Sequence, residues 1–475
     1  MTRELSASLE KHGFTPYPES VRTIRDGLRL FVAARKAQKA VGMVQTEKRL
    51  ELSSAVLPGG LTMSSGARVG LHTLTWENYQ KLKTLMPISP SQCDKHASFG
   101  TGDRLGLVSG AHLNALVRHP VFPVIAQQSP RELVRTKRDF RDVLLKAVMG
   151  ILESGCAGPY GADADHIKDE EYLMMGAEAG FSMYTLDISD WLQDTAASSP
   201  DQPSLLSRAI VADHAQMELP VPNYKTYAIS EQELLRSAQI YEKAMERGKR
   251  FDSLLRGVVQ DFDLEISMDE GARDTTVEDH LFVAEYLHRS GIDFQSLAPK
   301  FPGKFQKGID YEGDVNTLAQ SLRRHVALSS QIGGYRLSLH SGSDKFSIYP
   351  LFAEMTEGRF HIKTSGTSWL QAVKVIASAD AALLQELYIL CLENLDESKK
   401  AYDVSITRRD FPAEMLDDLS AFLSRPDVRQ LFHISYGALL DTKRNEIFET
   451  LDRHEAEHYA LVEKNIKGHL ELLFC

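Results

Sequence analysis

The sequence predicts an α/β protein built on a (β/α)8 TIM-like barrel, with an N-terminal extension and C-terminal helices. From about residue 96, short apolar segments typical of strands alternate with longer segments of helical periodicity. Such alternation predicts a parallel sheet with right-handed crossovers. Eight strand–helix units favour a closed barrel over an open sheet. We therefore expect the extension at 1–95, the barrel at 96–370, and at 371–475 a helical region packed on the barrel.

The N-terminal extension mixes several kinds of element. Residues 20–44 are expected to be helical, because their apolar residues cluster on one side of a helix. Residues 50–74 contain Gly59, Gly60 and Gly66, and predict short strands with turns. A helix is expected at 76–85, closed by the prolines that follow it.

The barrel strands are expected where short apolar runs end in polar or glycine-rich loops. The eight candidates are 97–103, 122–127, 158–165, 182–187, 262–267, 294–298, 335–340 and 359–364. Helices are expected in the connections, at 131–153, 230–259, 277–290 and 315–330. A ninth apolar run at 430–435 leaves open a count shifted by one strand. Long amphipathic helices are expected at 370–402 and 442–474.

Charge and composition exclude several classes of partner. The 475 residues carry a formal net charge of −11, which argues against a general binder of nucleic acid or membrane surfaces. No apolar run reaches the ~18 residues of a membrane span, and the polar start is unlike a signal peptide. The four cysteines lack Cys-x-x-Cys spacing, which suits a reducing cytoplasm. We expect a cytoplasmic protein with a small-molecule substrate; a homo-oligomer is left open.

A histidine ends one of the expected strands. Leu337 and Leu339 point to one side, whereas Arg336, Ser338 and His340 point to the other. A Ser-Gly-Ser-Asp loop follows and ends the regular structure. In a (β/α)8 barrel the carboxyl ends of strands carry the chemistry. The alternative is an ordinary strand end with a hydrogen-bonded histidine.

Two further strand ends carry acidic and basic groups. Asp165, His166 and Lys168 follow a glycine-rich strand and place a possible base beside a possible metal ligand. The alternative there is a solvated helix entry with an aspartate cap. Asp263 and Glu265 share the polar face of their strand, which must point into the barrel. Inward carboxylates need a metal, a partner or a raised pKa, and a buried salt bridge would also serve.

The eighth strand and the first strand end offer groups for an anion. His361 and Lys363 share the inward face, and the Thr364–Ser365 loop that follows has amides suited to a carboxylate or phosphate. Arg104 is a second candidate anion clamp. For each lysine or arginine alone, the alternative is a plain surface charge.

A zinc-protease motif occurs near the end of the chain. His454 and His458 match His-Glu-x-x-His. We interpret the match as accidental, because the surrounding residues are charged, whereas the motif helix of zinc proteases is buried beneath the cleft.

His433 lies at a further expected polar strand end, and we rank it below the other candidate site residues. The glycine-rich residues 99–103 lack the spacing of a dinucleotide or Walker loop, so no nucleotide cofactor is indicated.

Four segments together resemble the tagaturonate epimerase family: 99–106, 164–168, 339–345 and 360–367, within a likeness from about residue 76 to the end. The resemblance implies a metal-dependent enzyme that acts on hexuronate-derived keto acids and interconverts D-tagaturonate and D-fructuronate. Some relatives interconvert fructose and tagatose at C4. The residues alone would predict only a metal-dependent barrel enzyme with a small polar substrate.

Within that family, local geometry assigns a role to each candidate residue, for retro-aldol cleavage and re-addition at C4. A divalent metal (Zn, Ni or Mn-like) is expected on His166, His340 and His361. Asp165 and Glu265 are expected to exchange protons with the reacting hydroxyl. The substrate carboxylate is expected at Arg104, Lys345, Lys363, Thr364 and Ser365.

Other functions stay open at this point. A different barrel enzyme, such as a ketose isomerase or an aldolase, would give other products. A sugar-acid binding protein would bind its ligand without turnover. Hydride transfer is a mechanistic rival that the missing dinucleotide motif weakens, and a zinc protease on the last helix is the most distant alternative.

Overall fold

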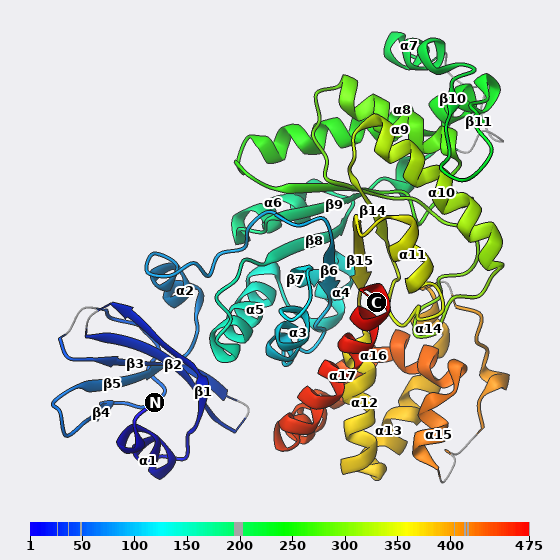
Figure 1. Cartoon of the computed structure of the whole chain (residues 1–475). Coiled ribbons are helices and arrows are strands. Elements are labelled where there is room, and N and C mark those ends of the chain that lie inside the picture. Colours follow the sequence, from blue (N-terminus) through cyan, green and yellow to red (C-terminus); the bar gives the residue numbers. More distant parts are fainter. Residues whose placement is uncertain are drawn as a thin grey trace.

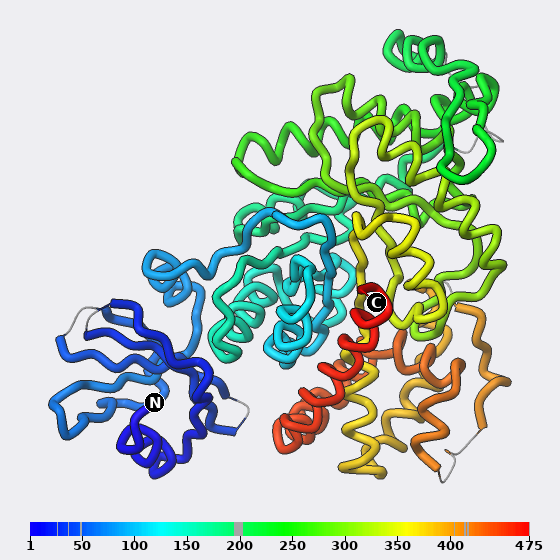
Figure 2. The backbone as a smooth tube through the Cα atoms, viewed as in Figure 1, coloured from blue at the N-terminus to red at the C-terminus, as the bar shows by residue number. Residues whose placement is uncertain are grey.

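The computed structural model describes residues 1–25, 27–36, 38–47, 50–193, 203–402, 404–412, 415 and 418–474. An N-terminal antiparallel sheet, a central barrel and a group of C-terminal helices follow one another along the chain (Figure 1). In the tube view, the last helix leads back to the side of the barrel (Figure 2). Helices with the length and apolarity needed to cross a bilayer are absent from these described ranges.

Eight parallel strands close the central barrel, which confirms the predicted fold class. They are β6 (Ser98–Thr101), β7 (Phe122–Gln128), β8 (Gly161–Ile167), β9 (Met183–Asp187), β12 (Asp263–Ser267), β13 (Ser296–Ala298), β14 (Arg336–Leu339) and β15 (Phe360–Thr364). They neighbour one another in chain order, and β15 pairs with β6 to complete the ring. Each strand overlaps one of the eight predicted segments, so the chain forms the barrel without a ninth strand.

Helices follow the strands on the outside of the barrel. They are α3 (Ser109–Leu116), α4 (Pro130–Thr136), α5 (Phe140–Ser154), α6 (Glu170–Ala179), α8 (Glu231–Arg256), α9 (Val277–Arg289), α10 (Val315–Ile332), α11 (Tyr349–Met355) and α12 (Thr367–Ala379). The helices predicted near 230–259, 277–290 and 315–330 are confirmed. The single helix predicted at 131–153 is wrong: Lys137 takes a left-handed φ of 55° and ends α4, and Asp139 caps α5 in a capping box.

An excursion between β9 and β12 projects from one side of the barrel (Figure 1). Its described elements are η1 (Ser189–Trp191), α7 (Leu205–His214), β10 (Glu218–Leu219) and β11 (Tyr227–Ala228). It lies beside α8 and α9, and therefore adds to the outer layer of the barrel.

The N-terminal extension is an antiparallel sheet, so the helix predicted at 20–44 is wrong. The elements are α1 (Arg3–Lys11), β1 (Thr15–Arg25), β2 (Leu28–Arg35), β3 (Gln38–Gln45), β4 (Leu61–Thr62), β5 (Arg68–His72) and α2 (Trp76–Leu82). Gly27 has a φ of 77° between β1 and β2, and Val32 pairs with Val41 between β2 and β3. Glycine in the left-handed region favours a turn, and β-branched residues favour strands. The helix predicted at 76–85 is confirmed by α2.

The C-terminal region is helical, as expected, but its helices are shorter than predicted. They are α13 (Ala381–Glu393), α14 (Leu395–Lys399), η2 (Arg408–Asp410), α15 (Leu419–Ser424), α16 (Pro426–Arg453) and α17 (Glu455–Leu473). Breaks at Asp380 and His454 divide the expected long helices. The ninth strand considered at 430–435 is wrong, because this apolar run lies in α16 behind Pro426 at its first turn. A short apolar run has no period that separates a strand from a buried helix.

Candidate active site

Two adjoining cavities open at the carboxyl ends of the barrel strands. The inner cavity has a volume of about 220 Å³ and the outer cavity about 580 Å³. Both are bordered by Arg131, His166, Glu270, Lys307, His340, Ser341 and Tyr402. His166 belongs to β8 and His340 directly follows β14, so the strand ends bring the two histidines to this shared border.

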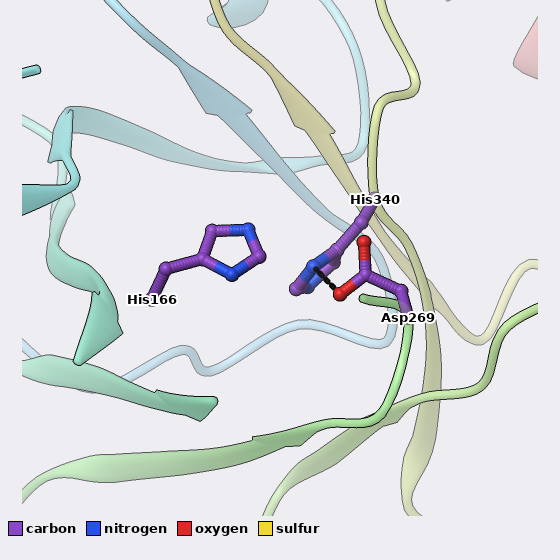
Figure 3. Close-up of side chains that lie close together, drawn as sticks. All are labelled: His166, Asp269 and His340. Atoms are coloured by element: carbon purple, nitrogen blue, oxygen red, sulfur yellow. Dashed lines mark hydrogen bonds and ion pairs between the residues drawn. The ribbon is translucent and has the colours of Figure 1, made fainter. Parts of the chain in front are cut away.

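Three side chains at this border form what we call the His–Asp–His group: His166, Asp269 and His340 (Figure 3). The two imidazole centroids are 4.9 Å apart, and Nδ1 of His340 lies 3.1 Å from Oδ1 of Asp269. One possible ligand atom from each residue lies within 4.8 Å of the others. A second group combines His166 with Asp187 and Glu270. The structure thus brings together two of the three predicted metal ligands.

Each of these histidines has a carboxylate on its other ring nitrogen. Nδ1 of His166 lies 3.0 Å from Oδ2 of Asp187, and Nε2 of His340 lies 2.6 Å from Oε1 of Glu265. An ionised carboxylate only accepts, so these two nitrogens carry protons and donate. The opposite nitrogens are then the ones available to an ion beside Asp269. Carboxylate partners of this kind orient metal-binding imidazoles.

The carboxylates reverse the usual effect of burial on the two histidines. Burial lowers the pKa of His166, but Asp165 and the hydrogen bond to Asp187 outweigh it and raise the pKa to about 10. Burial also opposes the charged form of His340, and there Asp269 contributes most to a pKa raised to about 9. Positive charge is therefore favoured at this point, whether protons or a divalent cation carry it.

A buried ion cluster adjoins the His–Asp–His group. Nζ of Lys363 lies 2.7 Å from both Asp163 and Asp165 and 3.0 Å from Glu265. Burial raises the pKa of Asp163 to about 6. At Asp165 burial acts in the same sense, but Lys363 and His166 outweigh it and lower the pKa to about 2. Asp165 and Lys363 border the inner cavity, whereas Glu265 is fully buried and borders neither cavity.

The third predicted ligand, His361, lies deeper inside the barrel. Its Nδ1 lies 2.8 Å from Oγ of Ser98, and its buried Nε2 has no hydrogen-bond partner among the described residues. Burial lowers its pKa to about 3. It borders neither cavity and belongs to neither group of possible ligands. On β15 it precedes Lys363 by two positions, so it shares the inward face but lies further from the strand end.

Arg104 borders the inner cavity with its guanidinium already engaged. Its Nε donates to Glu132 at 3.0 Å, and Nη1 donates to the carbonyl of His433 at 2.8 Å. The guanidinium also lies 3.9 Å from the ring centroid of Tyr436. His433, which the sequence suggested as a strand end, is instead a residue of α16, and its carbonyl accepts a hydrogen bond from Arg104.

The other predicted carboxylate-binding residues divide between cavity and core. The ammonium of Lys345 donates to three backbone carbonyls, including that of Gln306 at 2.9 Å, and borders neither cavity. The hydroxyl of Thr364 is buried and donates to the carbonyl of Gly100. Ser365 borders the inner cavity. Ser365 therefore lies at the cavity, whereas the side chains of Lys345 and Thr364 make hydrogen bonds to backbone carbonyls inside the protein.

The His-Glu-x-x-His segment does not assemble a metal site in the described ranges. His454 lies at the break between α16 and α17, and its side chain is 40% exposed. His458 is buried, and burial lowers its pKa to about 4. Neither belongs to a group of possible metal ligands.

Several residues of the site were missed by reasoning from the sequence. Asp187 closes a predicted strand, and Asp269 follows another by two positions, so strand-end position was a usable signal for both. Arg131 and Lys307 come from a helix start and a long connection. Their approach to the cavities depends on loop paths that no periodic pattern encodes.

The donor set of the His–Asp–His group fits a divalent transition metal. Two imidazole nitrogens and one carboxylate oxygen suit Zn²⁺, Ni²⁺ or Mn²⁺. Three protein ligands leave coordination positions for a substrate. The orientation of both imidazoles by Asp187 and Glu265 is a further feature of such centres.

Known proteins of one kind resemble this chain along nearly its whole length. Residues 17–473 match the UxaE family, described as tagaturonate epimerase. A tagaturonate/fructuronate epimerase of Thermotoga maritima is 38% identical over 410 residues, which is 84% of this chain and 85% of that relative. A glycerol-complexed crystal structure of a fructuronate-tagaturonate epimerase from Cohnella laeviribosi is 31% identical, with a TM-score of 0.90 over 99% of this chain and 98% of that chain. The native structure of that enzyme is also 31% identical and gives a TM-score of 0.89 over 99% of each chain. This chain therefore belongs to the tagaturonate epimerase family, and it is an isomerase of the carbohydrate epimerase kind.

Proposed function

We propose that the protein interconverts D-tagaturonate and D-fructuronate, which differ in configuration at C4. The observation that carries the proposal is the His–Asp–His group at the barrel mouth, with a carboxylate behind each histidine. It occurs in a chain whose curated relative is named for this conversion. An inner cavity of about 220 Å³ is compatible with a six-carbon sugar acid.

A divalent cation, Zn²⁺, Ni²⁺ or Mn²⁺, would be held by His166, Asp269 and His340. Bound there, it would supply a Lewis acid for the ketone and the neighbouring hydroxyl of the substrate. Asp187 and Glu265 would fix the orientation of the two imidazoles. Glu265, expected from the sequence to carry a proton, is then a positioning residue, because its buried carboxylate has no access to either cavity.

The chemistry at C4 requires a bond cleavage. C4 lies β to the ketone, so its hydrogen is not acidic and enolisation cannot invert it. In retro-aldol cleavage the C4 hydroxyl gives its proton to Asp165 while the C3–C4 bond breaks and its electron pair forms an enediolate. The aldehyde turns, C3 adds to its other face, and Asp165 returns the proton to the C4 oxygen. The ammonium of Lys363 keeps Asp165 ionised and in place.

Product analysis of the purified protein tests this function. D-Tagaturonate should yield D-fructuronate, chelation should abolish the conversion, and Zn²⁺, Ni²⁺ or Mn²⁺ should restore it. Carbon-13 isotope effects at C3 and C4, without a primary deuterium effect at C4, would separate bond cleavage from hydride transfer. An aldose product would indicate a ketose isomerase, and two three-carbon fragments an aldolase. Binding without turnover would indicate a sugar-acid binding protein.

A further inference from the structure

Lys307 differs from the other cations of the inner cavity in having no acidic partner. It lies in the connection between β13 and α10 and borders both cavities. Its ammonium donates to Oγ of Ser341 at 2.8 Å. Over the residues that the structure describes, no carboxylate approaches it within ion-pair distance. Since Ser341 directly follows His340, this hydrogen bond fixes the ammonium beside the His–Asp–His group.

Every other lysine and arginine of the inner cavity is paired with a carboxylate. The pairs are Arg104 with Glu132 at 3.0 Å, Arg131 with Glu270 at 3.2 Å, Lys168 with Asp190 at 2.8 Å, and Lys363 with Asp163 and Asp165 at 2.7 Å. An arginine or lysine that already serves a carboxylate has less to offer a second anion. Arg104 and Lys363 are two of the residues expected from the sequence to bind the substrate carboxylate. Because both already pair with acidic side chains, they are less suited to that role than Lys307.

The charge distribution around the cavity points to the same residue. Four carboxylates, those of Glu132, Asp165, Asp169 and Glu270, offset four of the five cationic side chains that border the inner cavity, so only a small excess of positive charge remains for an acidic substrate. Lys307 is half-buried, and an ammonium partly removed from water without a counter-ion is unfavourable, so burial lowers the pKa of Lys307. A carboxylate supplied by the ligand would complete a charge-assisted hydrogen bond.

We propose that Lys307 binds the carboxylate of the sugar-acid substrate and thereby selects an acid over the corresponding neutral ketose. The inference rests on the proposed function, because that reaction leaves the C6 carboxylate remote from the reacting C3–C4 bond. The cation of the His–Asp–His group would then hold the ketone end, and Lys307 the acid end. Two points of attachment would fix C4 next to Asp165 through the cleavage step.

The test compares one acidic and one neutral ligand on Lys307→Met, which removes the charge at similar side-chain length. The KM for D-tagaturonate should rise about 10- to 100-fold, the range for one hydrogen bond to a charged group. The inhibition constant of D-fructose, which lacks the carboxylate, should stay within about twofold. Lys307→Arg keeps the charge and should recover most of the loss. Metal content should match wild type in both variants.

A matched control comes from a lysine that is also unpaired but lies elsewhere. Lys146 projects from α5, forms no ion pair with the part of the chain that the structure describes, and borders a cavity of about 420 Å³ between the N-terminal sheet and the barrel. Lys146→Met should leave both constants unchanged. An unchanged KM in Lys307→Met, or an equal rise for tagaturonate and fructose, overturns the carboxylate role while the epimerase stands. Absence of turnover in the wild type removes the proposed function and this inference together.

Discussion

Two pairs of histidines lie inside this molecule at similar ring distances, and their surroundings shift their pKa values in opposite directions. At the mouth, His166 and His340 have centroids 4.9 Å apart, and their pKa values are raised to about 10 and about 9. Between α9 and α10, His280 and His325 have centroids 5.1 Å apart. Burial lowers the pKa of His325 to about 4 and that of His280 well below its usual range.

The partners on the outer nitrogens explain the difference. The His280–His325 pair is bounded by neutral groups, the hydroxyl of Tyr335 and the carbonyl of Thr275. The mouth pair is bounded by carboxylates on both sides. Two adjacent imidazoles are therefore not by themselves a metal centre. The carboxylates behind them distinguish a site that attracts cations from a hydrogen-bonded core.

Removing a mouth histidine should have the largest effect. His340→Gln is expected to lose bound divalent metal and to lower kcat/KM by about 10³-fold or more, because a ligand and the Lewis acid go together. The matched change in the core pair, His325→Gln, should keep metal stoichiometry while lowering stability. Metal analysis with kinetics on both variants checks the contrast. Equal metal loss in the two would contradict it.

The next effect is expected at the proton carrier. Asp165→Asn keeps the size of the side chain but removes the base, so kcat should fall by about 10²- to 10⁴-fold. Metal content should stay at the wild-type level, because Asp165 is outside the His–Asp–His group. Wild-type turnover in this variant would remove Asp165 from the mechanism.

A smaller effect is expected from the carboxylate behind a mouth histidine. Glu265→Gln replaces the acceptor for Nε2 of His340 with an amide, and metal affinity should fall about 10- to 100-fold. Competition with a chelator of known affinity measures the change. If Glu265 instead carries a substrate proton, kcat should collapse at saturating metal, and the positioning role would be wrong.

The core pair should appear in the pH dependence of stability. The folded-state pKa of His325 is lowered to about 4 from an ordinary value near 6.5, so its contribution is fully present above pH ~6.5 and is lost as pH falls toward 4. Between pH 7.5 and 5 this group alone should reduce the free energy of unfolding by about 2 kcal/mol. Denaturant titrations at both pH values, on wild type and His325→Gln, check it. An unaltered pH slope in the variant would contradict the neutral-core account.

The barrel and two of the three members of the His–Asp–His group could be predicted, because both depend on local pattern. Each strand is a short apolar run with a polar end, and His166 and His340 lie at such ends. Asp269 lies just past a predicted strand, but which loop residue turns inward is decided by the loop path. For His361, the alternation of polar and apolar residues predicted that the side chain points into the barrel. It did not predict how deep along the barrel axis the side chain lies.

The N-terminal sheet could not be predicted because its signals compete. The apolar residues between 28 and 44 fit one side of a helix as well as two paired strands. Pairing of β2 with β3 in a hairpin, and of β3 with β5 across a long connection, decides the outcome. The roles of lysines and arginines also depend on contacts that are distant in sequence. The ammonium of Lys345, for example, binds backbone carbonyls of the loop that contains Gln306 and Ile309, which no local pattern predicts.

Anomalous diffraction from crystals soaked with Zn²⁺ or Mn²⁺, recorded at the metal edge, tests the central claim most directly. We predict a single strong peak within coordinating distance of Nε2 of His166, Nδ1 of His340 and a carboxylate oxygen of Asp269. A peak held by Asp187 and Glu270 instead, or no peak at the barrel mouth in a crystal of active enzyme, would contradict it.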